Sequence, residues 1–278
     1  MRNRFTGSIL TIVAVLAFSP VLLAQTPSVP RSGGAKSTPD LSGTWDASSD
    51  DPVTGPGAFT TALPAGRGGI PIFGFTSEEP PMQSWALEKL KATRGGRGPT
   101  ERGREETDPV MYPYCMPHGF PRVYTSPLAI EIVQAPDRVY MFFEASHLIR
   151  RIFTDGRKHL EGWGPTFMGT SHGRWDGDTL VVETDSILSL NKQAWLDNLA
   201  HPFTDALRVT ERLRRVAQET LQIDFTFDDP GAYTKPWTGR KVFRLKPDRE
   251  MTDFIICETH MQEDFSRDLR NGKPAGKP

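Results

Sequence analysis

The sequence predicts an all-β protein, either an antiparallel up-and-down barrel or a strongly curved sheet, with one N-terminal helix and a Gly/Pro-rich irregular segment. Three observations predict this class. From about residue 123 onward, short apolar runs alternate with tight turns. The segment 221–228, LQIDFTFD, alternates apolar and polar residues, as a strand does when one face is buried. Between two further runs, Asp176-Gly177-Asp178 is a strong hairpin signal.

Residues 1–24 have the features of a signal peptide. Arg2 and Arg4 precede an apolar run that ends in Leu22-Leu23-Ala24, and a polar stretch follows. The run is short for a membrane-spanning helix, and Pro20 would interrupt one. We therefore expect an exported protein, periplasmic or extracellular, with no membrane span after cleavage.

The remaining chain predicts one domain with flexible ends. Residues 25–40 are rich in Pro, Ser, Thr and Gly and predict a flexible leader. A single barrel-like domain is expected over 41–265, followed by a polar, flexible tail over 266–278. Removing residues 1–24 takes away two arginines and no acidic residue, so the formal charge falls from -1 to -3. That balance gives no electrostatic reason to bind nucleic acid.

The elements of this domain are expected in a definite order. Leu41–Asp46 forms a first strand, and the Gly/Pro-dense segment 50–76 is irregular. A helix is expected at about 81–93, capped by Ser77 and ended by Gly95-Gly96, because apolar residues recur there on one face. The further strands are expected at 128–134, 138–144, 148–153, 172–175, 179–184, 207–216, 220–227, 240–245 and 251–257.

Cys115 and Cys257 are the only two cysteines. An even number in an exported protein favours a disulfide between them, and two buried thiols are the alternative. Each cysteine has a histidine three residues later, but zinc requires thiolates, which an oxidising compartment removes. We therefore expect neither a metal nor another cofactor.

Common catalytic signatures are missing from the sequence, including G-x-S-x-G, H-E-x-x-H, the P-loop and the Rossmann glycine pattern. A polar cluster in the middle of the chain contains Arg157, His159 and His172, and the two histidines flank a loop with Trp163 and Phe167. If the strands on either side of this loop are neighbours, the histidines lie at its two roots. Imidazoles beside carboxylates can act as acid and base. The alternative is ordinary turn chemistry with histidines bonded to the backbone.

Two other residues are candidates for ligand contact. Glu211 shares a strand face with Leu207, Val209 and Leu213, so it is expected to point inward. A buried carboxylate needs a partner or a raised pKa, so Glu211 is either a polar anchor for a ligand or half of a cross-strand Arg–Glu pair. Trp237, like Trp163, lies in a loop beside Gly or Pro, where a large ring has less reason to pack.

Six motifs are spread over residues 108–238: Asp108-Pro109, Cys115-x-Pro117-x-Gly119-x-Pro121-Arg122, Thr154-Asp155-Gly156-Arg157-x-His159, Gly173–Val182, Asp205-Ala206-Leu207-x-Val209-x-Glu211-Arg212 and Pro236-Trp237-Thr238. With these motifs the chain resembles a family of exported bacterial proteins abundant in acidobacteria and proteobacteria. The resemblance implies kinship and compartment, and it implies no activity.

A second resemblance concerns the first strand. Gly43-Thr44-Trp45 resembles the G-x-W motif of lipocalins and other calycins, and Thr204-Asp205 is similar to their second motif. Lipocalins are eight-stranded barrels that hold small apolar ligands, so the resemblance implies a calycin-like barrel. The chain departs from that family because an irregular segment and a helix follow its first strand. The arginine that packs on the motif's tryptophan is not identifiable in the sequence.

Taken together, the sequence predicts an exported protein that binds a small, partly apolar molecule inside a β-barrel. The expected ligand contacts are Arg157, His159, Trp163, Phe167, His172, Glu211 and Trp237. Two other classes stay open: an enzyme (isomerase, lyase or hydrolase) that uses His159 and His172, and an envelope module that acts through a protein partner. The oligomeric state is left open.

Overall fold

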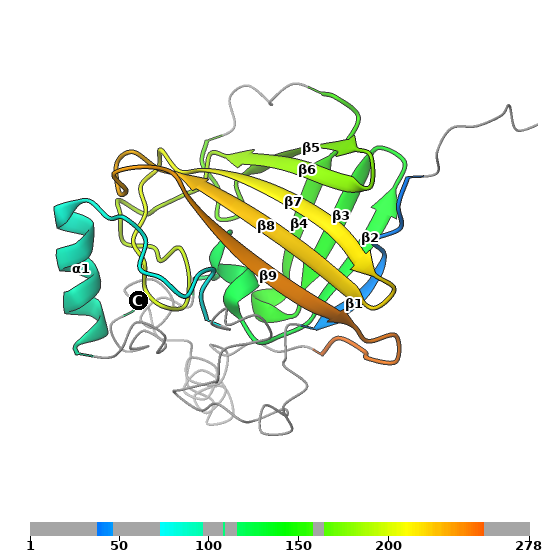
Figure 1. The fold of residues 1–278 in the computed structure, drawn as a ribbon, viewed down its shortest axis with the longest axis horizontal. Helices are drawn as coiled ribbons and strands as arrows, with labels where there is room; N and C mark the ends of the chain where they lie inside the picture. The colour runs from blue at the N-terminus through cyan, green and yellow to red at the C-terminus, as the bar shows by residue number, and fades with distance from the viewer. Residues whose placement is uncertain (1–37, 47–72, 97–107, 109–115, 158–163, 253–278) are drawn as a thin grey trace, which may run out of the picture. The chain divides into compact units, whose positions relative to one another are not determined.

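A computed structural model of the chain describes residues 38–46, 73–96, 108, 116–157 and 164–252. Within them, nine strands form one closed barrel and one α-helix lies outside it (Figure 1). The elements are β1 (Gly43–Asp46), α1 (Ser84–Arg94), β2 (Ile130–Ala135), β3 (Arg138–Phe143), β4 (Leu148–Phe153), β5 (Thr170–Asp176), β6 (Thr179–Asp185), β7 (Arg208–Ala217), β8 (Thr220–Asp228) and β9 (Trp237–Leu245), with the 3-10 helices η3 (Arg122–Thr125) and η4 (Ala145–His147). The predicted all-β barrel with one N-terminal helix is confirmed.

The strands follow one another around the barrel in sequence order, and β1 pairs with β9 to close it. Every pair is antiparallel except β4–β5, which is parallel over Ile152↔Ser171 and Phe153↔His172. Each antiparallel pair reverses the strand direction, and the reversals around a closed ring must be even in number. A ring of nine strands therefore needs a parallel pair, and the loop between β4 and β5 carries the chain back along the barrel.

The local patterns form the elements that they predict. In β8, Leu221, Ile223, Phe225 and Phe227 are all buried and the residues between them are more exposed, as the alternation requires. Asp176-Gly177-Asp178 turns β5 into β6, with Gly177 at φ 61°. A positive φ is cheap for glycine because it has no side chain to clash.

Several boundaries differ from the expected ones; in particular, β9 begins at Trp237, which was expected in a loop, rather than at 240. The helix begins at Ser84 rather than near 81, and its N-cap is Gln83, which makes no side-chain cap hydrogen bond, rather than Ser77. It ends as predicted at Gly95, which has a left-handed backbone. Of the strand expected at 251–257, Met251 and Thr252 are not in a strand, and the rest lies outside the described residues. The last described strand is β9.

The barrel closes at β9 because both edges of this strand form backbone hydrogen bonds. One edge pairs with β8 along the whole strand. The other pairs with β1 at Arg244 and Leu245, and further along the Arg240 N–H donates to the Phe75 carbonyl at 2.8 Å. Phe75 belongs to the predicted irregular segment, of which residues 73–76 are described. This segment therefore completes the wall where the short β1 stops.

The described interior of the barrel is filled by side chains. Tyr124 of η3 is fully buried, and its ring packs edge-on against Phe143 and Phe225 at centroid distances of 5.2 and 5.4 Å. Phe75 packs against Phe225 at 4.7 Å. Aromatic pairs in such tilted arrangements add stabilisation beyond the area they bury. The centre of the barrel is therefore a packed core.

Trp45 of the G-x-W motif is completely buried near the opposite end of β1 from Gly43. Its indole N–H donates to the Leu41 carbonyl at 2.9 Å, and the Arg215 guanidinium lies 5.4 Å from its ring centroid. An arginine therefore lies against this tryptophan, and the sequence did not reveal it because β7 is distant from β1 in the chain. A cation over an aromatic face is a stabilising contact.

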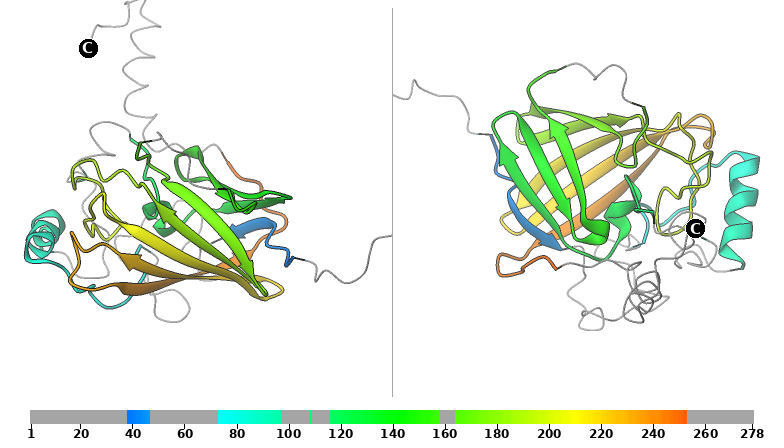
Figure 2. Two further views of the ribbon diagram at one scale, coloured as in Figure 1. Left: turned by 90° about the horizontal axis from the view of Figure 1, so that it is seen from above. Right: turned by 180° about the vertical axis from the view of Figure 1, so that it is seen from behind.

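The long connections gather at the end of the barrel where α1 lies (Figures 1 and 2). The Trp85 indole donates to the Gly231 carbonyl at 2.8 Å, and Arg94 Nε donates to the Leu199 carbonyl at 2.9 Å. These bonds join α1 to the β8–β9 and β6–β7 connections. No helix among the described residues is long and apolar enough to cross a membrane. The predicted signal peptide and the tail lie outside the described residues, and so does the leader apart from residues 38–40.

Candidate functional site

The centre of the barrel holds a buried ion pair. Glu211 of β7 points inward, as predicted, and is 0% exposed, while Arg150 of β4 is 1% exposed. Arg150 Nη1 donates to the Glu211 carboxylate at 2.9 Å and to the Tyr124 hydroxyl at 2.8 Å. Arg150 also donates to Ser171 at 3.1 Å and to Thr184 at 2.8 Å. Since β4 and β7 are not neighbours, the pair spans the interior.

The polar atoms of this pair already bond to each other and to neighbouring hydroxyl groups, so they are not available to bind a ligand. Burial and the Glu211 charge raise the pKa of the Tyr124 phenol, which keeps its proton and donates to the Met141 sulfur at 3.1 Å. The Arg150 guanidinium lies 4.1 Å from the Phe120 ring centroid. Of the two roles expected for Glu211, the Arg–Glu pair is the one that the structure shows, with a partner from across the barrel instead of the neighbouring strand.

A second charged cluster lies at the end of the barrel beside α1. In the β6–β7 connection, His201 Nδ1 bonds to the Asp197 carboxylate at 2.7 Å. On the other side of the ring, Nε2 bonds to the Glu79 carboxylate at 3.0 Å. Arg94 of α1 pairs with the same Glu79. His201 and Asp197 are buried, but the Glu79 side chain is 37% exposed, so the cluster reaches the surface.

The pKa values of His201 and Glu79 are shifted in opposite directions. Burial disfavours the imidazolium, but the Asp197 charge and hydrogen bonds to both carboxylates outweigh it and raise the pKa of His201 to about 9. Burial also opposes ionisation of Glu79, yet hydrogen bonds from His201 and Arg94 lower its pKa to about 2. A doubly protonated imidazole can donate to both carboxylates at once.

Lys241 adds a further titratable group near Asp197. It is 5% exposed, and its ammonium donates to the Gly74 carbonyl at 2.9 Å. Burial lowers the pKa of Lys241 to about 7, although the Asp197 charge opposes the shift. Sequence reasoning missed this cluster. The available signal was Asp197 and His201, four residues apart in a mostly apolar stretch.

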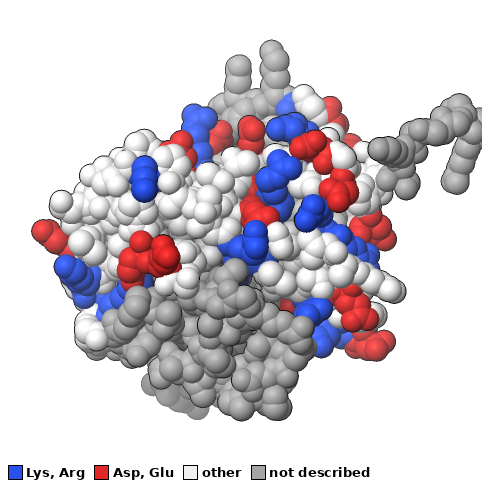
Figure 3. Space-filling model, in the orientation of Figure 1, with Lys and Arg blue, Asp and Glu red and all other residues white. Residues whose placement is uncertain are grey.

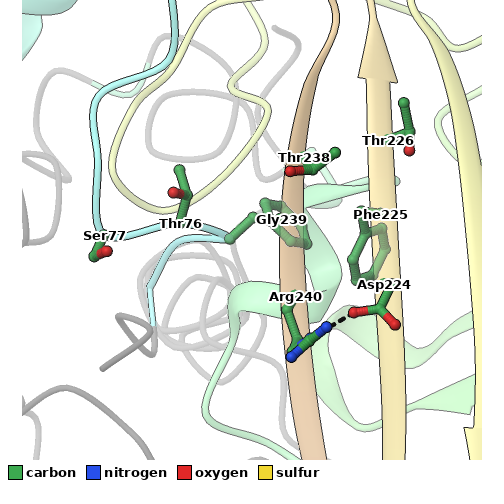
Figure 4. A pocket seen from close by; sticks show the side chains of 9 residues that line it. Thr76, Ser77, Asp224, Phe225, Thr226, Thr238, Gly239 and Arg240 are labelled. Atoms are coloured by element: carbon green, nitrogen blue, oxygen red, sulfur yellow. Dashed lines mark hydrogen bonds and ion pairs between the residues drawn. The ribbon is translucent and has the colours of Figure 1, made fainter. Parts of the chain in front are cut away.

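A groove of about 430 Å³ opens on the outer wall, between the segment Phe75–Ser77 and strands β8 and β9 (Figure 4). The described residues that line it are Phe75, Thr76, Ser77, Asp224, Phe225, Thr226, Thr238, Gly239 and Arg240. Thr226 and Thr238 are direct cross-strand partners, and Asp224 forms an ion pair with Arg240. The groove therefore offers hydroxyl groups and a matched charge pair, and its volume lies in the range of small-molecule sites.

Gly239 fixes the inner side of this groove. A Cβ atom there would lie 2.5 Å from Phe75 Cβ, far closer than side-chain carbons approach. The missing side chain lets the segment at Phe75 lie directly against β9, where the Phe75 carbonyl accepts a hydrogen bond from the Arg240 N–H. The wall of the groove is consequently held by backbone bonding as well as by packing.

Two of the predicted site residues meet on the outer wall at the β4–β5 seam. The Arg157 guanidinium lies 4.3 Å from the Phe153 ring centroid and is paired with Asp155. His172 faces outward opposite Phe153, with ring centroids 6.1 Å apart. The strands on either side of the loop are neighbours, which is the condition set above for the two histidines to lie at its roots. His159 and Trp163 lie outside the described residues.

The other predicted residues lie elsewhere. Trp237 is 7% exposed and stacks on Phe227 at 4.2 Å, so this tryptophan packs in the core near the His201 cluster. The Phe167 carbonyl accepts from the Phe120 N–H at 2.7 Å, and its side chain is partly buried. The predicted ligand contacts are therefore divided between the outer wall, the core and the centre of the barrel. Those that the structure describes do not line one common cavity.

Cys115 and Cys257 lie outside the described residues, so their disulfide stays a prediction. Among the described residues, no group of three or more His, Cys, Asp or Glu side chains is placed to hold a metal ion. The described residues form a closed nine-stranded barrel with a cluster of charged side chains at the end beside α1. No protein-family model, curated protein or solved structure matches this chain.

Proposed function

We propose that this protein binds a small, partly apolar molecule that carries hydroxyl or carboxylate groups, in the groove between Phe75–Ser77 and strands β8 and β9. The groove itself carries the proposal, because it combines a ligand-sized volume with converging polar groups. Threonine and serine hydroxyls both donate and accept hydrogen bonds, and an arginine recognises a carboxylate with two parallel bonds. The Asp224–Arg240 pair is at the surface and can exchange its partner for a ligand.

This proposal places the ligand on the wall rather than on the barrel axis, where the sequence led us to expect it. At the axis, a ligand would have to displace Tyr124 or separate Arg150 from Glu211, each fully or almost fully buried. Separating a buried ion pair is costly because it leaves an uncompensated charge. The groove requires no such rearrangement. We further propose that binding takes place outside the cytoplasm, which the signal-peptide features of residues 1–24 support.

The proposal is tested by screening the mature protein against hydroxy acids and small glycosides with native mass spectrometry, then by calorimetry of the best ligand. We expect Arg240→Gln to weaken binding about tenfold or more, the loss typical of one charge-assisted contact. Arg212→Gln is the matched control, because both arginines are 50% exposed and each pairs with one aspartate. Equal effects of the two substitutions, or a ligand that protects residues away from the groove, would overturn the proposal.

The second candidate is an enzyme, and a specific observation favours it. His201, Lys241 and Glu79 have shifted pKa values and lie around Asp197, and such groupings are common in active sites. Among the described residues this cluster is a stronger source of an acid and a base than His172, and His159 lies outside them. For any turnover found in a substrate screen, His201→Gln should abolish kcat while His172→Gln leaves it within about twofold. The reverse order would return the role to His172.

A further inference from the structure

The outer face of β2, β3 and β4 is apolar and aromatic at its centre. Tyr140 and Phe142 point outward because Val139, Met141 and Phe143 point into the core. The strand pairing sets Val133 opposite Tyr140, and Phe142 opposite Ile149. Val133 is 41% exposed and Ile149 46% exposed. The rings of Tyr140 and Phe142 are 6.2 Å apart and nearly parallel.

The opposite wall of the same barrel shows that this is not a general property of its surface. At equivalent outward positions, β7, β8 and β9 carry Arg212, Asp224 and Arg240, with threonines in the next row. Figure 3 views that side and shows basic and acidic side chains interspersed. In the right-hand view of Figure 2, β2, β3 and β4 face the viewer and no described element lies over them. A contiguous apolar patch on a soluble protein commonly marks an interaction site.

The charges around this patch indicate what covers it. Cross-strand pairing makes two rows, Glu131–Phe142–Ile149 and Val133–Tyr140–Arg151. Glu131 and Arg151 are both exposed and stand at opposite corners of the grid that these rows form. We name these six residues the β2–β4 face. A two-fold axis lying in the face, along the diagonal from Val133 to Ile149, brings Glu131 of one copy opposite Arg151 of another.

We propose that the β2–β4 face binds a second copy of this chain in a two-fold symmetric dimer. The same axis places Tyr140 and Phe142 of one copy against those of the other. Within the six residues of the face, it brings no two like charges together. In such an isologous interface each residue pair occurs twice, so a charge pair contributes twice to the dimer. Tyrosine and arginine are enriched in the cores of protein interfaces. The proposal uses residues remote from the groove and is independent of its ligand.

The test is light scattering and analytical ultracentrifugation of the mature, full-length chain over a range of concentrations. Wild type should be dimeric at micromolar concentration. Ile149→Glu should make it monomeric, because this exposed side chain would carry a charge into the apolar centre. Glu131→Arg and Arg151→Glu should each weaken dimerisation about tenfold or more, by placing like charges opposite each other. Arg212→Glu on the opposite wall is the control and should leave the dimer intact.

The charge reversals also give a complementation test that a folding defect cannot imitate. Mixing the Glu131→Arg and Arg151→Glu proteins should form a heterodimer, because each arginine then meets a glutamate at both corners. Circular dichroism confirms that each variant is folded. A wild-type protein that stays monomeric at about 100 μM, well above the dissociation constants of stable dimers, would overturn the proposal. So would a dimer that Ile149→Glu leaves intact, because that dimer uses another face.

Discussion

Two of the buried ion clusters among the described residues differ in their access to water. At the barrel centre, Arg150 and Glu211 are sealed on all sides and hydrogen-bonded to neutral hydroxyl groups. Beside α1, His201 is just as buried, but its partner Glu79 has 37% of its side chain in solvent. One cluster is therefore isolated, and the other is a chain of charges that begins at the surface.

The difference lies in which groups can titrate. An arginine keeps its proton over the whole range in which proteins are folded, so the Arg150 guanidinium keeps its charge near neutral pH. A histidine with a raised pKa loses its proton at a reachable pH. We therefore expect the attachment of the β6–β7 connection, which includes His201, to depend on pH.

The largest effect is expected from breaking the sealed pair. Glu211→Gln keeps the shape but leaves the Arg150 charge buried without a counter-charge, so it should lower the free energy of unfolding by about 3–5 kcal/mol. Urea denaturation with an unchanged m value measures it. The paired replacement Arg150→Met with Glu211→Leu should recover most of the loss, since no buried charge remains. A double variant as unstable as the single one would contradict this account.

An intermediate effect is expected from titrating His201. Its pKa is raised from 6.5 to about 9 in the folded protein, so its contribution is fully present below pH 6.5 and is lost as the pH rises through 9. The full contribution corresponds to roughly 3 kcal/mol. The free energy of unfolding is measured from pH 6 to pH 10 in the wild type and in His201→Gln, and the stability advantage of the wild type should shrink across this window. The comparison of the two proteins is needed because the lowered pKa of Lys241 adds stability as the pH rises through 7 in both of them. A difference between the two proteins that does not change with pH would show that the histidine is not the titrating group.

The smallest effect is expected at the exposed end of the same cluster. Glu79→Gln should cost no more than about 1 kcal/mol, because this carboxylate is partly solvated and water compensates for much of the lost pairing. The pKa of Glu79 is lowered from 4.5 to about 2, so its contribution is present above pH 4.5 and is lost as the pH falls through 2. Thermal unfolding at pH 7 and pH 3 measures both. A loss as large as that of Glu211→Gln would remove the distinction between the two clusters.

Local sequence patterns predicted most of the wall. The alternation in β8 and the Asp-Gly-Asp hairpin between β5 and β6 formed as expected, and Glu211 faces inward as its strand face required. These features depend on periods of two residues and on turns of a few residues, which are visible in a short window. The end of the barrel beside α1 was less predictable, since its connections follow no period.

The sequence by itself determined the fold class, the strand order and the inward side of most strands, because side-chain alternation and turn chemistry act between near neighbours in the chain. Only the tertiary structure decided the partners of the charged groups. Arg150 meets Glu211 across 61 positions and Glu79 meets His201 across 122. Only the tertiary structure, too, showed that β4 and β5 are parallel and that Arg215 lies on Trp45. Such contacts arise when the barrel closes and brings distant strands together, and no local pattern encodes which distant side chain fills the space opposite.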